Sequence, residues 1–163
     1  MTAPADACAL LDEASLPLFG AATEPVPEQA RALADLLTNH LCLHPERRDH
    51  RALLIDHALD RRRAHPLQIA VIGHEVGRRA GLRTFVASCA AEPWTAIAGA
   101  DGIALVGPGS VDGEPDNASV RHRCPHQVAR AVLAHVSAGA PPERSRRAAE
   151  LLRALPGCDH RAA

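Results

Sequence analysis

Residues 58–88 read ALDRRRAHPLQIAVIGHEVGRRAGLRTFVAS, and this stretch decides the fold. It predicts a helix that begins at Pro66, because the first turn of a helix leaves its N–H groups unpaired and therefore tolerates proline. Apolar residues recur at helical spacing until Gly81 ends the helix. Gly73 and Gly77, four residues apart, leave a flat strip against which another segment can pack closely. The pattern is that of a buried central helix.

Working outward, helices are predicted before this stretch, and strands followed by helices after it. Apolar spacing and breakers indicate helices over 28–41, 49–63, 125–137 and 143–155, and short strands over 84–87, 95–98 and 102–106. Residues 5–18 are expected to form a short helix or a loose N-terminal segment. Turn residues between positions 99 and 102 make the last two strands a hairpin. This order is typical of an α+β fold, with a central helix packed on a small antiparallel sheet. We expect a single domain over 1–163, comprising a core over 28–118 and a C-terminal helical hairpin over 119–157.

Composition argues against several classes of function. The net charge is −1 and the chain holds only three aromatic residues, which disfavours binding to nucleic acid. No run approaches the roughly 18 apolar residues of a membrane span. The first charged residue is Asp6, which is unlike a secretory signal. We therefore expect a cytoplasmic protein that binds neither nucleic acid nor membranes.

Two further features of composition are informative. All 18 basic residues are arginine, a bias typical of a GC-rich bacterial genome that carries no functional meaning by itself. The five cysteines are scattered and form no C-x-x-C pair, so neither a disulfide framework nor a ribbon-type zinc site is indicated. No cofactor is expected.

The opening stretch resembles the SirB-type transglutaminase-like family. In that family a basic turn leads into a helix that closes on a sequence similar to EVARRLGL, and a strand follows. Residues 60–63, Pro66, Glu75–Val76 and 78–82 stand at matching positions. The final helices, with AAELLRALPG over 148–157, resemble the tetratricopeptide-like tail of family members. The resemblance implies a transglutaminase-like, papain-like core.

Active members of such folds use a Cys, a His and an Asp. The resemblance places the nucleophile at the start of the central helix, which here is Pro66. The His position falls at Glu92, close to Trp94, and the Asp position falls on Gly107. None of these residues supplies a thiolate, a base or a group to orient one. The resemblance therefore implies a degenerate triad and no catalysis through this site.

Other clusters keep an enzymatic alternative open. Cys124 stands just before the helix predicted over 125–137, where the helix dipole would favour a thiolate, and His126 is nearby. Cys89 is a second candidate thiol, although an apolar run around it favours a buried structural role. His122, Cys124 and His126 are the fallback set for a zinc site. Chance proximity and a simple helix-entry role are the competing explanations.

Arginines beside the central helix are candidate binding residues. Arg62, Arg63 and Arg78 carry guanidinium forks suited to carboxylate or phosphate, and Trp94 lies next to the degenerate site. A solvated helix end, with these arginines paired to nearby acids, is the simpler interpretation.

Two functions remain. The first is a non-catalytic module whose groove or helical hairpin binds a protein or peptide partner. The alternative is an enzyme, either a Cys-dependent amide hydrolase or acyl transferase or a zinc-dependent one, built on the non-homologous Cys and His residues.

Overall fold

The computed structural model describes residues 4–107, 110–112 and 120–155. Its α-helices are α1 (Pro4–Ser15), α2 (Val26–Asp35), α3 (Ile55–Arg61), α4 (Pro66–Arg79), α5 (Pro125–Gly139) and α6 (Pro142–Ala154). Its strands are β1 (His44–Pro45), β2 (Arg63–Ala64), β3 (Thr84–Cys89), β4 (Glu92–Gly99), β5 (Gly102–Gly107), β6 (Ser110–Asp112) and β7 (Arg121–His122). Short 3-10 turns lie at Leu16–Leu18, Ala21–Thr23 and His50–Leu53, and a π-helical turn at Leu36–His40 continues α2.

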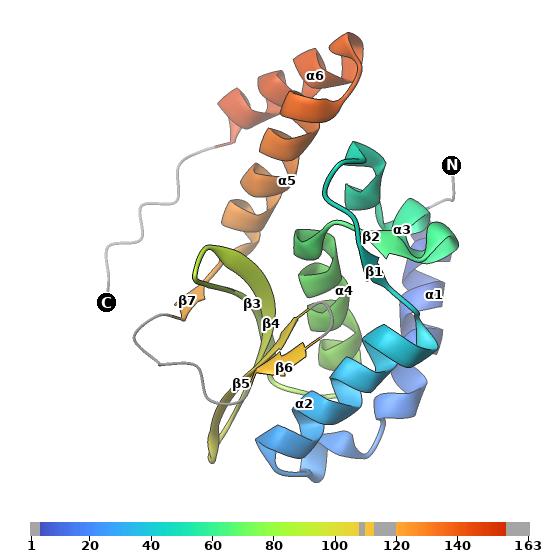
Figure 1. The fold of residues 1–163 in the computed structure, drawn as a ribbon, viewed down its shortest axis with the longest axis vertical. Helices are drawn as coiled ribbons and strands as arrows, with labels where there is room; N and C mark the ends of the chain where they lie inside the picture. Colours follow the sequence, from blue (N-terminus) through green and yellow to red (C-terminus); the bar gives the residue numbers. More distant parts are fainter. Residues whose placement is uncertain (1–3, 108–109, 113–119, 156–163) are drawn as a thin grey trace.

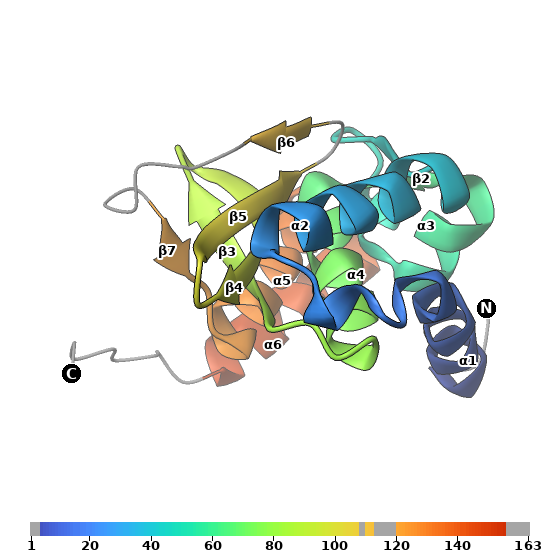
Figure 2. The same cartoon turned by 90° about the horizontal axis from the view of Figure 1, so that it is seen from below.

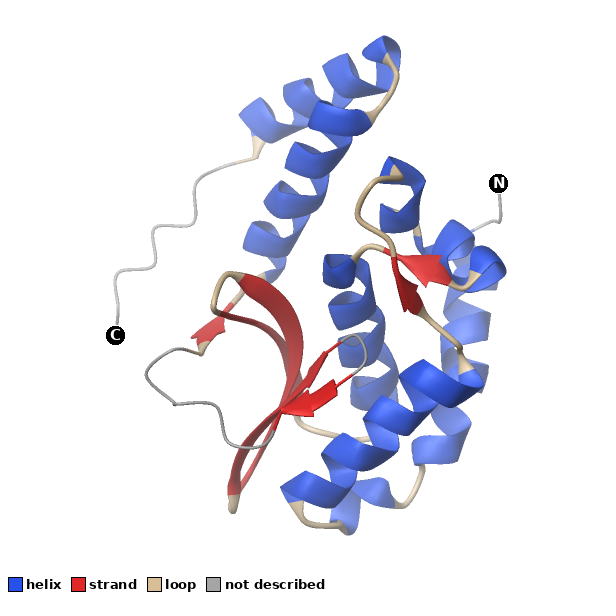
Figure 3. Cartoon of the chain, viewed as in Figure 1, coloured by secondary structure: helices blue, strands red, loops and turns tan. Residues whose placement is uncertain are grey.

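The architecture is a helical layer against a sheet (Figures 1 and 3). The sheet is antiparallel with the strand order β6-β5-β4-β3-β7. Helices α4 and α2 pack on β4 and β5, and α1 packs on α4. The predicted α+β class is confirmed. A separate parallel pair, β1 with β2, lies among the helices.

Helix α4 runs through the core as the sequence pattern predicts. Nine of its residues are buried, from Pro66 to Gly77. A Cβ atom at Gly73 would lie 2.4 Å from Thr95 Oγ1, and one at Gly77 would lie 2.7 Å from Thr84 Cγ2. The glycine strip therefore receives two threonine side chains of the sheet. This close approach of helix and sheet requires glycine at both positions.

The two faces of the sheet have different neighbours, because side chains alternate along a strand. Thr95 and Ile97 of β4 are fully buried on the side of α4 and α2. Trp94 and Ala96, the alternate residues, belong to a separate apolar cluster with Leu105. Trp94 therefore lies on the face that is turned away from α4.

The structure differs from the predicted elements in several places. Strand β4 begins at Glu92, not at residue 95, because β3 and β4 meet in a tight turn at Ala90 and Ala91. Both alanines have positive φ values, of 49° and 67°. Such turns usually carry Asn or Gly, so the signal was missed. The helix predicted over 49–63 is interrupted at Leu54, whose extended backbone separates a 3-10 turn from α3.

Helices α5 and α6 form a hairpin, which extends from the rest of the molecule in Figure 1 and lies behind it in the view of Figure 2. No residue of α5 is buried, and Ala148 is the one buried residue of α6. Within the described ranges, no helix is long and apolar enough to cross a bilayer.

Candidate functional site

The N-terminal end of α4 is the position where the resemblance places a nucleophile. Pro66 opens the helix and its side chain is fully buried. The residue before it, His65, caps the helix, because its Nδ1 accepts a hydrogen bond from the Leu67 N–H over 3.2 Å. One free N–H of the first turn is thereby satisfied within the chain. The end of the helix is closed by its own residues.

The electrostatics of His65 keep its ring neutral. Burial, with a further contribution from the nearby His135 and Arg47, lowers the pKa of His65 from 6.5 to about 4, while Glu92 acts in the opposite direction. A charged imidazole would donate from both nitrogens and lose its cap hydrogen bond. The ring of His135, on α5, lies 4.5 Å from that of His65 between centroids. This histidine is built as a structural cap.

Glu92 lies at the same end of α4, since its charge acts on the pKa of His65. It is the first residue of β4, and its Oε2 lies 2.7 Å from Nη2 of Arg47. The carboxylate is about half exposed and paired with a cation, so it stands as a surface ion pair beside the helix end.

Gly107 does not join these residues. A Cβ atom built on it would lie 2.2 Å from the Trp94 ring, on the sheet face turned away from α4. Gly107, to which the resemblance assigns the Asp position, therefore lies on the other face of the sheet from α4. The cause is strand register, since Trp94 and Gly107 lie on the same face and that face alternates with the one bearing Thr95.

Helix α5 covers the first turns of α4. Leu67 and Ala70 of α4, with Val86 of β3, form an apolar cluster, and it packs against Val128, Ala131 and Val132 of α5. Beside this contact remains a cavity of about 180 Å³. It is lined by Arg47, Arg48, Asp49, His50, Leu53, His65, His135, Ala138 and Gly139. Arginines, histidines and one carboxylate line it, and no cysteine is among them.

The alternative catalytic residues lie elsewhere. Cys89 ends β3 and packs with the Trp94 cluster, on the face opposite to α4. Cys124 is the N-cap residue of α5, where its backbone N–H donates to Gln127 Oε1 over 3.1 Å. His126 is exposed. Among the described residues, no three His, Cys, Asp or Glu side chains come together as metal ligands, so His122, Cys124 and His126 do not form such a group.

The predicted binding residues do not share one surface. Arg62 is the exposed C-cap of α3, with a left-handed φ of 55°. Arg63 pairs with Glu46 at 3.7 Å, and Arg78 pairs with Glu75 at 3.1 Å at the other end of α4. Trp94 faces the opposite side of the sheet. The simpler interpretation, a set of solvated and locally paired arginines, fits this placement.

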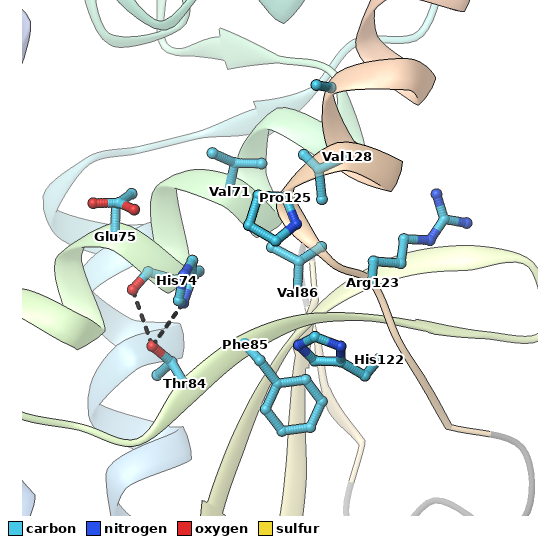
Figure 4. Close-up of a pocket in the computed structure, with 11 residues that line it drawn as sticks. Val71, His74, Glu75, Thr84, Phe85, Val86, His122, Arg123, Pro125 and Val128 are labelled. Carbon is cyan, nitrogen blue, oxygen red and sulfur yellow. Dashed lines mark hydrogen bonds between the residues drawn. The ribbon is translucent and has the colours of Figure 1, made fainter. Parts of the chain in front are cut away.

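A larger cavity, which the sequence did not indicate, lies between α4, β3 and the start of α5. Its volume is about 390 Å³. Figure 4 shows Val71, Val86, Val128 and Pro125 gathered at its centre. It is lined by Val71, His74, Glu75, Thr84, Phe85, Val86, His122, Arg123, Pro125, Val128 and Ala129. The volume is in the range of small-molecule and side-chain pockets.

One end of this larger cavity carries a fixed hydrogen-bond network (Figure 4). The Thr84 hydroxyl donates to the His74 carbonyl over 3.0 Å. The Nδ1 atom of His74 lies 3.0 Å from Oγ1 of Thr84. Because the hydroxyl has a single hydrogen, Nδ1 must donate, which leaves Nε2 of the neutral ring as an acceptor. Burial lowers the pKa of His74 and so favours the neutral form.

Comparison with known proteins identifies the family of this chain. The family profile described as Transglutaminase-like superfamily matches residues 7–88, which is 82 of the 163 residues. The chain belongs to this superfamily. No curated protein and no solved structure matches it. The matched region ends before β4 and β5, the strands that hold Glu92 and Gly107.

Substitution of Pro66 by cysteine tests the closure of this helix end. We expect Pro66→Cys to fold, with a loss of about 1 kcal/mol, because a helix start tolerates the change but some burial is lost. The introduced thiol should stay unlabelled by iodoacetamide in the native state and react after unfolding, because position 66 is buried. Intact-mass measurement against the parent protein provides the readout. Labelling within minutes in native buffer would show that α5 leaves the site open.

Proposed function

We propose that this chain is a non-catalytic, SirB-type member of the transglutaminase-like superfamily that acts in the cytoplasm as an accessory module binding a protein or peptide partner. In this proposal α4 and the sheet correspond to a papain-like core that has lost its reacting groups. The partner places an apolar side chain in the cavity between α4, β3 and α5.

The observation that carries the proposal is the closed N-terminus of α4. A nucleophile in this position needs a thiol, an unpaired helix end and access for substrate. Here Pro66 supplies no thiol, His65 occupies an N–H of the first turn, and α5 packs over the following turns. Each of the three requirements fails for a separate structural reason.

The larger cavity supports recognition in place of catalysis. Its centre is aliphatic, with Val71, Val86 and Val128 from three different elements. The neutral His74 offers a single acceptor at one end. A pocket with an apolar body and few polar groups suits a peptide side chain such as leucine, or an aromatic ring with an N–H or O–H donor.

Filling this cavity tests the proposal. Ala129 is exposed and lines the cavity on α5, whereas Ala134 is exposed on the same helix and lies outside it. We expect acetylated tripeptide amides with a central Leu or Trp to shift the methyl NMR signals of Val71, Val86 and Val128. Ala129→Trp should abolish these shifts, because the new ring occupies the cavity. Ala134→Trp should retain them, with an apparent peptide affinity within twofold of that of the parent protein.

The same samples distinguish the enzymatic alternative. Thiol profiling with a limiting maleimide and an assay for amide hydrolysis should show no hyper-reactive cysteine and no turnover. If the parent protein shows turnover and Cys89→Ser or Cys124→Ser abolishes it, the protein is an enzyme and the proposal of a non-catalytic binding module is wrong. Absence of peptide-induced shifts in the parent protein would remove the cavity as the recognition site.

A further inference from the structure

Charge is strongly segregated along this chain, although its net value is only −1. Residues 1–119 carry ten arginines against sixteen carboxylates, a net charge of −6. Residues 120–155, which end in the α5–α6 hairpin, carry seven arginines against two glutamates, a net charge of +5. The hairpin extends from the body in Figure 1, so its charge is presented to solvent. A segregation of this size creates a strong local field that the overall charge conceals.

The arginines of the two regions differ in their partners. Every arginine–carboxylate ion pair of the described residues joins positions between 12 and 92. Within the described ranges, no arginine from 121 to 153 forms an ion pair with a carboxylate. Arg130 has a structural role, because it donates to the Leu155 carbonyl over 3.1 Å and so ties α6 to α5. On α6, Arg153 donates to the Ala149 carbonyl over 3.2 Å, whereas Arg144, Arg146 and Arg147 have no hydrogen bond or ion pair among the described residues.

Three residues of α6 form a continuous stripe, namely Arg144, Arg147 and Leu151. Their spacing of three and four residues places them on one side of the helix. All three are exposed, and Leu151 is 50% exposed. The neighbouring side of α6 faces α5, since the Ser145 hydroxyl donates to the Ser137 carbonyl and Ala148 is buried. The stripe therefore lies beside the hairpin interface and open to solvent.

The stripe also conflicts with the local stability of its own helix. Arg144 lies in the first turn of α6, where the helix dipole is positive and disfavours cations. Two like charges three residues apart repel each other as well. Sequences that break local rules in this way do so mainly at functional sites. An anionic partner would relieve both conflicts at once.

We propose that the Arg144–Arg147–Leu151 stripe is a docking surface for an acidic segment of another protein, which sets carboxylates against the two arginines and an apolar side chain against Leu151. Guanidinium groups bind carboxylates through paired N–H donors, so the arginines supply orientation as well as charge. The body of a second copy fits poorly, because Asp12, Glu28, Glu46, Glu75 and Glu92 already pair with its own arginines. The proposal holds whether or not the cavity binds a peptide.

The test uses the full chain and a fluorescein-labelled 12-residue peptide in which glutamates flank a central leucine. We expect fluorescence anisotropy to show binding at least tenfold tighter than that of the same peptide with glutamine at every glutamate. The triple variant Arg144→Gln/Arg147→Gln/Leu151→Gln should weaken binding at least tenfold. Because these side chains are exposed, circular dichroism should show an unchanged helix content.

A matched control changes the same numbers of charges and exposed leucines on the body. Arg48→Gln/Arg62→Gln/Leu10→Gln should alter the affinity less than twofold, because these residues are exposed outside the hairpin. An equal loss in this control would overturn the proposal in favour of unspecific charge attraction. Tighter binding of a 12-nucleotide oligothymidylate than of the acidic peptide would overturn it in favour of phosphate recognition. A dimer in solution that the stripe variant alone converts to a monomer would make the partner a second copy and also overturn it.

Discussion

Replacement of Gly73 by leucine is expected to destabilise the protein by at least about 3 kcal/mol, which is a large part of the stability of an ordinary domain. A Cβ atom at this position would lie 2.4 Å from Thr95 Oγ1 and 3.3 Å from Leu37 Cδ1. Thr95 cannot move away easily, because its hydroxyl donates to the Ala70 carbonyl over 3.0 Å and the residue is fully buried. Overpacking and a lost buried hydrogen bond therefore act together.

Urea denaturation followed by circular dichroism provides the measurement for Gly73→Leu and for the smaller change Gly73→Ala. We expect Gly73→Ala to lower the free energy of unfolding by about 2 kcal/mol, because the added Cβ atom already clashes with Thr95. Combining Gly73→Ala with Thr95→Ala should cost less than the sum of the single changes, because the clashing oxygen is gone.

Gly139→Ala serves as the matched glycine control for this series. An added Cβ at position 139 would meet only His50 Cβ, at an ordinary 3.6 Å. It should leave stability within about 0.5 kcal/mol of the parent, or slightly above it. A melting temperature of Gly73→Leu within a degree or two of the parent would show that α4 does not pack on β4 in this way.

The second large effect is a loss of stability in mild acid that originates at His65. Its pKa is about 4 in the folded protein against 6.5 for a free histidine. Because the folded value is the lower one, the unfolded chain binds more protons between these values, and stability falls as the pH falls from about 6.5 to about 4. The full shift corresponds to about 3 kcal/mol, of which about 2 kcal/mol should be lost between pH 7 and pH 5.

His65→Asn isolates this contribution. Asparagine is also a good N-cap residue, so the helix end stays capped while the titrating group is removed. We expect the unfolding free energy of the variant to fall by about 2 kcal/mol less than that of the parent between pH 7 and pH 5. His126→Asn, on the exposed side of α5, should follow the parent curve. Parallel curves for His65→Asn and the parent would mean that His65 is not buried as a neutral cap.

Both expectations concern α4, and they illustrate how far sequence reasoning reaches. The start at Pro66, the end at Gly81 and the close approach at Gly73 were all predictable. These are local signals, set by the backbone preferences of proline and glycine and by helical spacing. Membership of the transglutaminase-like superfamily could be predicted for the same reason, since the matching motif lies within one continuous stretch.

Sequence reasoning failed where the answer depended on register or on contacts between distant segments. The tight turn at Ala90 and Ala91 carries no usual turn residue, so the start of β4 was placed three residues late. The match to the family motif assigned Gly107 to the degenerate site. The strand register places it under Trp94 on the opposite face. A shift of one residue along a strand is enough to exchange the two faces of a sheet.

By itself, the sequence determined the central helix, the α+β order of elements and the absence of a thiol at the helix start, because each depends on residues close together in the chain. Only the tertiary structure decided that α5 covers that helix end and that α5 encloses a cavity against α4 and β3. Those features arise from packing between segments more than 30 residues apart, and no local preference encodes which of the possible contacts forms.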